Sequence, residues 1–389
     1  MTKKSDAPAI RFKGFSDAWE QRKVGELLIE RNEQAPMNEE YPLMAFIANE
    51  GVAPKGERYD RSSLVTDTEN KLYKRTEFGD FIYSSNNLET GSIGLNKYGK
   101  ACISPVYSVF HPTGIADSNF LGRRLVRKDF INSMVKWRQG VIYGQWRIHE
   151  SDFLKIDIPV PSVEEQIQIG TFLDYLDNLI TLHQRKFEKL TNVKKSMLEK
   201  MFPQNGSSYP EIRFKGFTDP WEQRKAKELC NIGTGKSNTQ DQVEDGIYPF
   251  YIRSDIPVKS NKYLYDCEAV ITIGDGNIGR VFHYVNGKFD LHQRCYKMTD
   301  FQDIWGKYFY YFFSTRFYDR AMKMTAKATV DSVRLEMISE MDIWKPTAID
   351  EQKKIAEFFA NLENLITLHQ RELEKLQNIK KSMLEKMFV

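Results

Sequence analysis

Cysteine is scarce in this sequence of 389 residues. The four cysteines stand at positions 102, 230, 267 and 295, with the spacing of neither paired metal ligands nor a dense disulfide framework. Long apolar runs are missing too, since no stretch approaches the roughly 18–20 residues that a bilayer-spanning helix needs. The sequence also opens without the charged-then-apolar pattern of a secretory leader. These absences argue against a metal site and a membrane partner, and they predict a soluble, cytoplasmic protein.

A strong excess of charge of one sign is also missing. Lysine and arginine number 56 against 53 aspartate and glutamate residues, which leaves a formal net charge of +3. So small a charge does not by itself indicate a nucleic-acid-binding protein, and any attraction to phosphate must come from local clusters of lysine and arginine. Apolar residues make up 41% of the sequence, and at this length they predict two or three ordinary cores.

Two segments occur twice, in the same order. Residues 10–27 return at 212–229 with 14 of 18 positions identical, and residues 165–202 return at 351–388 with 26 of 38 identical. Between these copies lie two inserts, residues 28–163 and 230–349, which barely resemble each other. A duplicated frame with unlike inserts is unusual for an enzyme with one active site, but it suits a protein that recognises two different things at a fixed distance.

The longer repeat has the pattern of a long amphipathic helix. Residues 162–165 (SVEE) have the form of a capping box, and residues 203–206 (PQNG) supply a stop signal. Apolar residues recur at heptad spacing over about 37 residues, so each copy carries an apolar stripe that must be buried. The expected coiled-coil seam residues are Ile169, Leu176, Ile180, His183, Phe187, Leu190 and Met197 in the first copy, and Ile355, Leu362, Ile366, His369, Leu373, Leu376 and Met383 in the second.

The charge pattern predicts how the two helices pack. Acidic residues gather in the first half of the first helix and basic residues in its second half, and the second helix repeats this with a weaker acidic start. Antiparallel packing lays acidic halves against basic halves and opposes the two helix dipoles. We therefore predict an antiparallel coiled coil, since helices of this length are rarely core helices of one globular domain. His183 and His369 are expected to set its register rather than to bind a metal.

The shorter repeat carries one tryptophan in each copy, Trp19 and Trp221. We interpret it as a structural entry segment whose indole ring packs against the sheet that follows. The alternative is that it docks a partner protein.

Both inserts show mixed strand and helix patterns. Strands are expected at residues 80–83, 101–110, 269–273 and 280–285, and a helix at 305–314. Residues 274–279 (GDGNIG) spell a dinucleotide-binding fingerprint, but strand-forming residues follow them, so we expect a hairpin turn. Residues 235–237 (GKS) lack the first glycine of a phosphate-binding loop. The sequence lacks the Asn-Pro-Pro-aromatic motif that is typical of amino-methyltransferases, and it has no credible Ser–His–Asp order. We therefore expect no catalytic residue in this chain.

Polar and basic residues cluster at the turns of both inserts. Arginine, asparagine, glutamine and histidine can hydrogen-bond to base edges, and lysine can hold phosphates, although solvated loops have the same composition. The candidate DNA-binding residues of the first insert are Ser84, Ser85, Asn86, Asn87, Lys97, Lys100, Lys136, Arg138, Tyr143, Gln145 and Arg147. Those of the second insert are Asn277, Arg280, His292, Gln293, Arg294, Lys323, Lys327, Thr329, Ser332 and Arg334.

The order of these parts resembles a known family. The IRFKGF-x-D-x-WEQRK segment, and helices that run from EEQ or DEQ through LITLHQR to KKSMLEKMF, closely resemble the DNA-specificity subunits of type I restriction-modification systems. The resemblance covers essentially the whole chain and is strong in the repeats and weak in the inserts. It implies an α+β fold with two mixed α/β target-recognition domains, residues 1–163 and 203–349. An antiparallel coiled coil of two long spacer helices, residues 164–202 and 350–389, would separate them in an internal pseudo-two-fold repeat.

The resemblance further implies a non-catalytic subunit that binds an asymmetric, bipartite target on double-stranded DNA. It implies assembly with two copies of a methylation subunit, which use S-adenosylmethionine to methylate adenine N6. Restriction subunits, which use ATP and magnesium to translocate and cut DNA, would complete the complex, and the chain itself would bind no cofactor. Antiparallel copies of one helix would carry equivalent inserts at opposite ends, and duplex DNA offers matching half-sites about one turn, roughly 34 Å, apart.

Two other functions stay open at this point. A protein-only coiled-coil scaffold would organise partner proteins without DNA recognition, and it predicts no salt-dependent DNA affinity. A self-sufficient methyltransferase or nuclease predicts activity from the purified chain alone.

Overall fold

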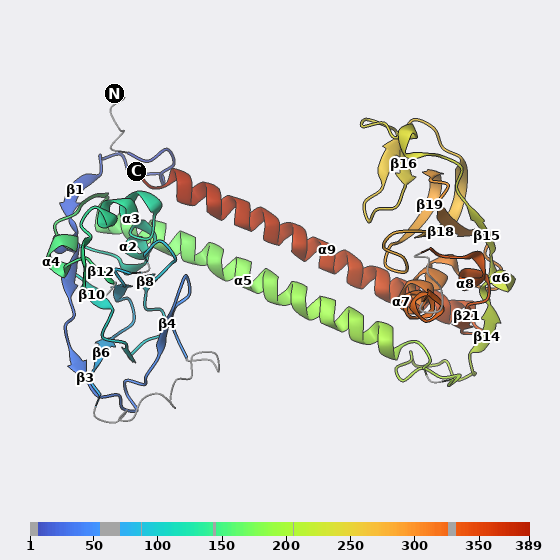
Figure 1. Cartoon of the computed structure of the whole chain (residues 1–389), viewed down its shortest axis with the longest axis horizontal. Coiled ribbons are helices and arrows are strands. Elements are labelled where there is room, and N and C mark those ends of the chain that lie inside the picture. The colour runs from blue at the N-terminus through green and yellow to red at the C-terminus, as the bar shows by residue number, and fades with distance from the viewer. Residues whose placement is uncertain (1–6, 55–70, 87, 143–144, 205, 326–331) are drawn as a thin grey trace. The chain divides into compact units, whose positions relative to one another are not determined.

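A computed structural model describes residues 7–54, 71–86, 88–142, 145–204, 206–325 and 332–389 of the chain. The chain divides into two compact units: unit 1 comprises Met1–Leu182 and Leu373–Val389, and unit 2 comprises His183–Glu372. Helix α5 (Val163–Lys200) begins in unit 1 and ends in unit 2, and helix α9 (Ile349–Lys386) begins in unit 2 and ends in unit 1 (Figure 1). The two long helices and the mixed α/β composition predicted from the sequence are confirmed.

Unit 1 contains several small antiparallel sheets. Strands β2, β10, β7 and β8 form a four-stranded sheet, and β3, β6 and β9 form a three-stranded one. Its strands are β1 (Glu20–Lys23), β2 (Leu28–Glu30), β3 (Gln34–Ala35), β4 (Ala45–Ile47), β5 (Gly51–Ala53), β6 (Tyr73–Thr76), β7 (Phe81–Tyr83), β8 (Ile93–Leu95), β9 (Ala101–Ile103), β10 (Ser108–Pro112), β11 (Gln139–Ile142), β12 (Gln145–Arg147) and β13 (Asp157–Val160). Its short helices are α1 (Val24–Leu27), α2 (Ser118–Arg124), α3 (Lys128–Val135) and α4 (Glu150–Phe153).

Unit 2 is built on a six-stranded sheet in the order β15-β20-β18-β19-β16-β17, in which only the β16 and β19 pair is parallel among the described strands. Its strands are β14 (Glu222–Lys225), β15 (Asn231–Thr234), β16 (Tyr248–Tyr251), β17 (Val258–Ser260), β18 (Tyr265–Ile273), β19 (Phe282–Leu291), β20 (Cys295–Thr299) and β21 (Asp342–Lys345). Its helices are α6 (Ala226–Leu229), α7 (Gly306–Thr325), α8 (Leu335–Ser339) and the 3-10 turn Thr239–Asp241.

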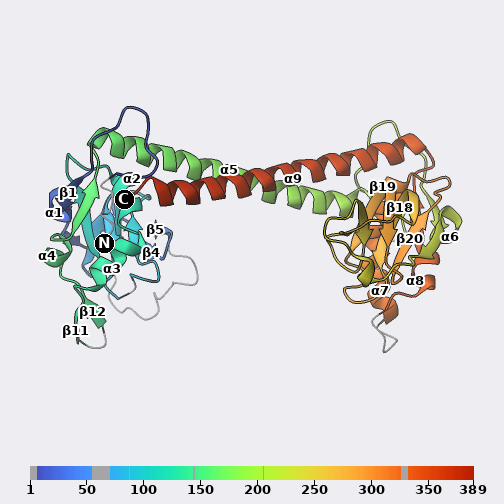
Figure 2. The ribbon, with the colours of Figure 1, turned by 90° about the horizontal axis from the view of Figure 1, so that it is seen from above.

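Strand β18 shows why this sheet is buried on both faces. Side chains alternate between the faces of a strand, so Val270 packs in the aromatic core that helix α7 contributes to, while Ile271 and Ile273 pack in a second cluster with Phe289. Figure 2 shows α7 alongside strands β18 to β20. The predicted strand at 269–273 falls within β18. The predicted strand at 280–285 overlaps β19 from Phe282 onward, and the predicted helix at 305–314 overlaps α7 from Gly306 onward. The GDGNIG string forms the turn between the antiparallel strands β18 and β19, as predicted.

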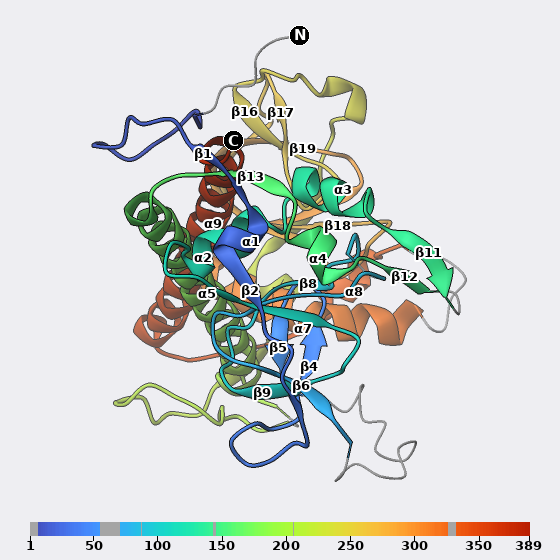
Figure 3. The same cartoon turned by 90° about the vertical axis from the view of Figure 1, so that its left-hand side faces the viewer.

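The duplicated frame folds in the same way in both units. The EQRK string of the short repeat forms β1 in unit 1, where Glu20 pairs with Val160 and Lys23 with Asp157 on strand β13. In unit 2 the same string forms β14 and pairs in the same register with β21. Figure 3 shows β1 and β13 side by side. The strand of the shorter repeat, which precedes each insert, thus pairs with the last strand of that insert.

A buried ion pair fixes the start of each long helix to the frame. The carboxylate of Glu165 accepts hydrogen bonds from Nε and Nη2 of Arg11 at 2.8 and 2.6 Å, and Glu351 accepts the same two bonds from Arg213 at 2.7 and 2.8 Å. Both glutamates are 1% exposed. Of the two hydrogen bonds of the predicted capping box, the structure contains one. Ser162 Oγ accepts the Glu165 N–H at 3.4 Å, but the Glu165 side chain binds Arg11 instead of reaching back to the cap.

The glutamine after each glutamate ties the helix to its insert. Gln166 accepts the Asp117 N–H and donates to the Pro161 carbonyl, and Gln352 accepts the Trp305 N–H and donates to the Pro346 carbonyl. A buried amide that is satisfied on both sides is costly to replace. The two repeated residues, glutamate and glutamine, thus anchor the helix to the frame and to the insert respectively.

Each unit also buries the far end of the helix that enters it. In unit 1 the Phe388 ring lies 6.4 Å from Trp19 and 5.4 Å from Phe120, and the Ile10 N–H donates to the Lys386 carbonyl at 3.0 Å. In unit 2 Phe202 lies 6.5 Å from Trp221, and the Ile212 N–H donates to the Lys200 carbonyl at 3.0 Å. The two tryptophans are buried structural residues. Among the described residues, the aromatic rings next to Trp19 are those of Phe120 on α2 and Phe388, and not rings of the following sheet.

Within each unit the long helices pack antiparallel. In unit 2 His183 faces His369 and, further along α5, Lys194 pairs with Glu363, which lies earlier on α9. In unit 1 Asp177 pairs with Lys380 at 2.5 Å. These ion pairs join acidic and basic residues in the way that the charge pattern predicted. Among the described residues, no helix is both long and apolar enough to cross a membrane.

Candidate nucleic-acid interface

The first candidate loop of unit 1 follows strand β7. Ser84 is 5% exposed, and Ser85 Oγ accepts the Ile148 N–H at 3.0 Å. These two serines hold the loop in place, and Asn86 is half-buried. Asn87 lies outside the described residues. The sequence pattern could not show that these serines point inward, because a polar residue at the end of a strand can face the core or the solvent, depending on the loop that follows.

Lys97 and Lys100 follow strand β8, and both are engaged within unit 1. Lys97 Nζ lies 3.0 Å from Asp174 on helix α5, and Lys100 pairs with Glu40. Both side chains remain about half exposed. Lys97 therefore lies against the long helix, and only Lys100 belongs to the polar network beside it.

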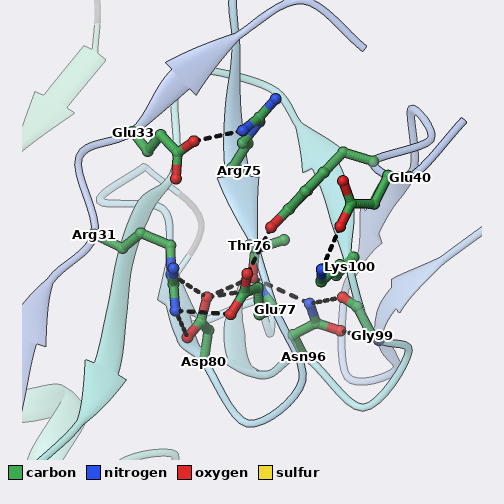
Figure 4. Close-up of polar contacts among 11 residues, drawn as sticks. Arg31, Glu33, Glu40, Arg75, Thr76, Glu77, Asp80, Asn96, Gly99 and Lys100 are labelled. Carbon is green, nitrogen blue, oxygen red and sulfur yellow. Dashed lines mark hydrogen bonds and ion pairs between the residues drawn. The ribbon is translucent and has the colours of Figure 1, made fainter. Parts of the chain in front are cut away.

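That network links the end of strand β6 with the segments that follow β2 and β8 and with the turn before β7 (Figure 4). Arg31 Nε donates to Asp80 at 2.9 Å, and the Tyr41 hydroxyl donates to Glu77 at 2.6 Å, which lowers the pKa of Glu77. Burial raises the pKa of Asp80. Asn96 is fully buried and donates to Thr76 and to the Gly99 carbonyl. The network fixes the turn that presents Lys100, and its acidic members make it a poor site for phosphate.

The remaining candidates of unit 1 gather on the β11–β12 hairpin and beside it. The hairpin extends from the body of the unit in both Figure 2 and Figure 3. Lys136 is exposed, Arg147 has a side chain 63% exposed, and Arg138 donates to Glu89 at 2.9 Å with its guanidinium 6.0 Å from the Trp146 ring. Gln145 begins strand β12, and Tyr143 lies outside the described residues.

Two exposed tryptophans were not among the candidates chosen from the sequence: Trp146 lies on strand β12, and Trp137 lies just before β11. Trp137 is 41% exposed and Trp146 45% exposed, whereas Trp19 and Trp221 are each 3% exposed. The available signal was the alternation of tryptophan with arginine in the strings KWRQG and QWR. Exposed aromatic rings beside arginine are typical of surfaces that stack on nucleic-acid bases.

In unit 2 three candidate turns meet at one end of the sheet. Asp275 and Ser332 form a backbone bridge, and the Val333 N–H donates to the Gly274 carbonyl at 2.7 Å. The Gly274 N–H in turn donates to the Arg294 carbonyl at 2.7 Å. This brings the turn that carries Asn277 together with residues 292–294 and 332–334. Asn277, Gln293, Arg294 and Arg334 are exposed there, and Ser332 is half-buried.

His292 belongs to this cluster but is buried, and the remaining described candidates of unit 2 lie elsewhere. His292 is 4% exposed, and its Nδ1 accepts the Arg294 N–H. Arg280 stacks on the Tyr318 ring at 4.4 Å and donates to the Tyr318 hydroxyl. Lys323 is exposed on α7, and Lys327 and Thr329 lie outside the described residues. Arg253, which donates to Asp275, was missed because only the folded sheet brings it to this turn.

The predicted seam residues lie inward on the long helices. Ile169, Leu176, Ile355, Leu362 and Leu373 are buried, and the others are half-buried. In unit 1, Leu376 and Met383 pack against the core that contains Ile169 and Leu176, and Ile180 is half-buried. In unit 2, Leu190 and Met197 pack against the core that contains Ile355 and Leu362, and Phe187 and Ile366 are half-buried. The apolar stripe therefore packs between the two long helices and also extends the core of each unit.

The two polar seam residues face each other. His183 Nδ1 and His369 Nδ1 lie 3.2 Å apart, so one ring donates and the other accepts. Burial, His183 and Lys186 all lower the pKa of His369. No group of three or more His, Cys, Asp or Glu side chains gathers as a metal site in the part of the chain that the structure describes.

We expect this histidine pair to make unit 2 sensitive to acid. Because the pKa of His369 is lower in the fold than the unfolded value of about 6.5, the unfolded chain binds protons first. Stability is then complete above about pH 6.5 and falls as the pH drops toward the folded pKa. Thermal melting at pH 7.5 and 5.5 measures the loss, and His369→Asn, which hydrogen-bonds without titrating, should reduce it. His283 and His292, whose pKa values burial also lowers, should leave a residual slope.

Comparisons with known proteins agree on one family. The family model described as "Type I restriction modification DNA specificity domain" matches residues 16–192 and 218–378, which is most of the chain. The type I restriction enzyme MjaVIII specificity subunit of Methanocaldococcus jannaschii is 22% identical, over 94% of this chain and 91% of that protein. The type I restriction enzyme EcoDI specificity subunit of Escherichia coli is 30% identical over 76 residues, 20% of this chain and 17% of that protein.

The fold has a counterpart among solved structures. The crystal structure of the type I restriction-modification system S subunit from M. genitalium superposes with a TM-score of 0.64. The alignment covers 98% of this chain and 99% of that chain at 14% sequence identity. At this identity the likeness concerns the fold alone.

Proposed function

Because this chain belongs to the type I restriction-modification DNA specificity family, we propose that it recognises an asymmetric, bipartite DNA target and positions a methylation machinery on it. One observation carries the proposal: two copies of one frame, each fixed by the same buried ion pair, hold two unlike inserts. The Arg11–Glu165 and Arg213–Glu351 pairs have the same two hydrogen bonds, yet one frame holds several small sheets and the other a six-stranded sheet. Equal frames suit two copies of one partner, and unlike inserts suit two unlike half-sites.

Two grooves that share repeat residues support docking of two copies of one partner. In unit 1 a groove of about 1050 Å³ is lined by Lys380 and Leu384 of α9 together with α2 and α3. In unit 2 a groove of about 530 Å³ is lined by Lys194 and Leu198, the repeat counterparts of that lysine and leucine, together with α7. On this proposal each groove faces one methylation subunit, and S-adenosylmethionine, ATP and magnesium belong to the partner subunits.

The two domains that would recognise DNA are residues 1–163 and 203–349, with the two long helices as spacer. Unit 1 would present the β11–β12 hairpin with its arginines and exposed tryptophans, and unit 2 would present the turns around Asp275. Both surfaces belong to the inserts and not to the repeats. A change of insert would therefore change the half-site, while the repeat residues that line each groove, such as Lys380 and Lys194, would stay the same.

Co-expression with a methylation subunit tests this function. Mapping methylated adenines on the DNA of those cells should give one motif with two defined halves and an unread gap. The purified chain alone should methylate nothing. Exchanging residues 28–163 for the corresponding insert of another family member should change one half of the motif only. A contiguous motif, no methylation by the complex, or a change in both halves would contradict the proposal.

The spacer gives a separate prediction. Deleting one heptad from each helix, residues 183–189 and 369–375, removes about 10 Å of helical rise and should shorten the unread gap while both half-sites keep their sequences. The mapped motif measures the gap. A matched control replaces the same heptads with those of the other copy, which keeps the length and should leave the gap unchanged. An unchanged gap after the deletion would show that the helices do not set the spacing.

A further inference from the structure

The GDGNIG turn of unit 2 has a role that its resemblance to a nucleotide-binding fingerprint hides. Gly274 lies against the backbone of the 292–294 turn, where its N–H donates to the Arg294 carbonyl at 2.7 Å. A Cβ atom at this position would stand 2.6 Å from that oxygen, closer than real contacts allow. Glycine therefore permits the close approach of the two turns, and the next residue, Asp275, comes to lie beside two arginines.

Asp275 binds both arginines through separate oxygens. Its Oδ1 accepts from Arg253 Nη1 at 3.2 Å and its Oδ2 from Arg294 Nη1 at 2.7 Å. The arginine side chains are 45% and 62% exposed, while that of Asp275 is 20% exposed. Burial raises the pKa of Asp275, but the hydrogen bonds and charges of Arg294 and Arg253 outweigh it and lower the pKa. The carboxylate is thus ionised at neutral pH and ties two exposed guanidinium groups together.

The arrangement leaves one edge of each guanidinium unused. Both arginines reach Asp275 with Nη1, and neither donates a hydrogen bond from Nε or Nη2 to another described residue. The Arg294 backbone is fixed as well, since its N–H donates to His292 Nδ1 at 3.1 Å. Burial and the charge of Arg253 lower the pKa of His292, so the ring stays neutral and accepts this bond. A fixed guanidinium with a free edge is organised in advance for two parallel hydrogen bonds.

We propose that Asp275, Arg253 and Arg294 form an arginine clamp that recognises guanine in the half-site of the second insert. This rests on the proposed function. The free edge of an arginine matches the O6 and N7 acceptors of guanine, the commonest specific contact to a base. Asp275 is a positioning residue that reduces the rotamer freedom lost on binding. A phosphate fits less well, because the Asp275 carboxylate would repel an anion bound to the same guanidinium groups.

Substitution of Asp275 separates these two ligands. Asp275→Asn removes a negative charge, so a surface that only held phosphate would bind every duplex more tightly and keep its motif. A clamp that recognises guanine should instead lose discrimination at one guanine of one half-site. The matched control is Asp266→Asn, which makes the same change of charge at an exposed position of β18, the strand that leads into this turn, and should leave the motif unchanged.

The experiment uses the full chain in complex with its methylation subunit. The wild-type motif is mapped first, and binding is then compared on duplexes with guanine or another base at each guanine of the motif. Arg294→Ala and Arg253→Ala should reduce the preference for one guanine roughly 5- to 150-fold. Arg294→Gln, which keeps size and polarity, should give the same relaxation if the alanine variant folds poorly. The other half of the motif reports that each variant is folded.

Two results would overturn the clamp. Loss of affinity by the same factor on all duplexes, with a salt dependence reduced by about one phosphate contact, would assign the arginines to the DNA backbone. An unchanged motif and affinity in Arg294→Ala would show that the arginines do not touch DNA. If the wild-type complex gives no bipartite motif, the proposed function itself fails and the clamp with it, whereas a motif with an unaffected guanine refutes the clamp alone.

Discussion

Phe202→Ala is expected to lower the free energy of unfolding of unit 2 by about 3–5 kcal/mol, the usual cost of emptying a large buried aromatic site. Phe202 is fully buried, and its ring lies 5.3–6.5 Å from those of Phe312, Tyr308, Phe359 and Trp221. A dense aromatic cluster of this kind relaxes little around a cavity, because each ring is held by several others. The variant should therefore retain most of the void.

The counterpart substitution, Phe388→Ala, should destabilise unit 1 instead. Phe388 packs against Trp19 and Phe120, and the guanidinium of Arg127 lies 5.4 Å from its ring. Hydrogen exchange followed by mass spectrometry, with increasing denaturant, measures each unit in the same sample. The result is specific because the two phenylalanines hold the same repeat position yet should affect different units. Phe78→Ala, at a site 69% exposed, should change neither unit by more than about 0.5 kcal/mol.

A contrary outcome is easy to recognise in this experiment. If Phe202→Ala increased exchange in both units equally, or in neither, the insertion of each helix end into one core would be wrong. The order of the effects also matters. Phe388 is 5% exposed and Phe202 is fully buried, so the loss should be larger for Phe202.

Glu165→Ala is expected to cost about 3 kcal/mol, because it leaves the Arg11 guanidinium partly buried without its carboxylate. The Glu165 side chain is 1% exposed and that of Arg11 14% exposed. Glu351→Ala should cost unit 2 a similar amount, since the Arg213–Glu351 pair has the same exposures. Chemical denaturation followed by unit-resolved hydrogen exchange measures both losses.

A double substitution tests the reason for this loss. Replacing the pair by apolar residues, Arg11→Met with Glu165→Leu, removes both charges and should recover most of the stability, because the penalty comes from the unpaired charge rather than from the missing bridge. Glu164→Ala is the matched control at the neighbouring exposed glutamate and should cost about 0.5 kcal/mol or less. A double variant as unstable as Glu165→Ala would show that the geometry of the ion pair itself is required.

The structural features that could be predicted are those that leave a regular pattern of apolar or charged residues in the sequence. The heptad stripe located both long helices and the residues that face inward, and the separation of acidic from basic residues gave the antiparallel direction that Asp177 and Lys380 confirm. The turn at residues 274–279 could also be identified, because the residues after it favour a strand over a helix.

Contacts between distant residues could not be predicted in the same way. Glu165 matched a local capping pattern, but its partner Arg11 lies 154 residues away, and no spacing rule connects them. Among the candidate site residues, Ser84 and His292 are buried and Lys97 binds the long helix, because composition does not tell which side of a turn faces solvent. Arg253 was missed for the converse reason, since only the pairing of β16 with β19 brings that part of the chain close to Asp275.

The exchange of helix ends has a consequence for synthesis on the ribosome. Domains of a nascent chain generally fold in the order in which they emerge. Here the first insert and its frame emerge early, but the aromatic side chain that completes the packing around Trp19 is Phe388. Unit 1 must therefore wait, with part of its apolar interior open, until the codons from residue 183 to Phe388 have been translated. The half made first is the half finished last, and a nascent chain in this state offers chaperones a defined surface to cover.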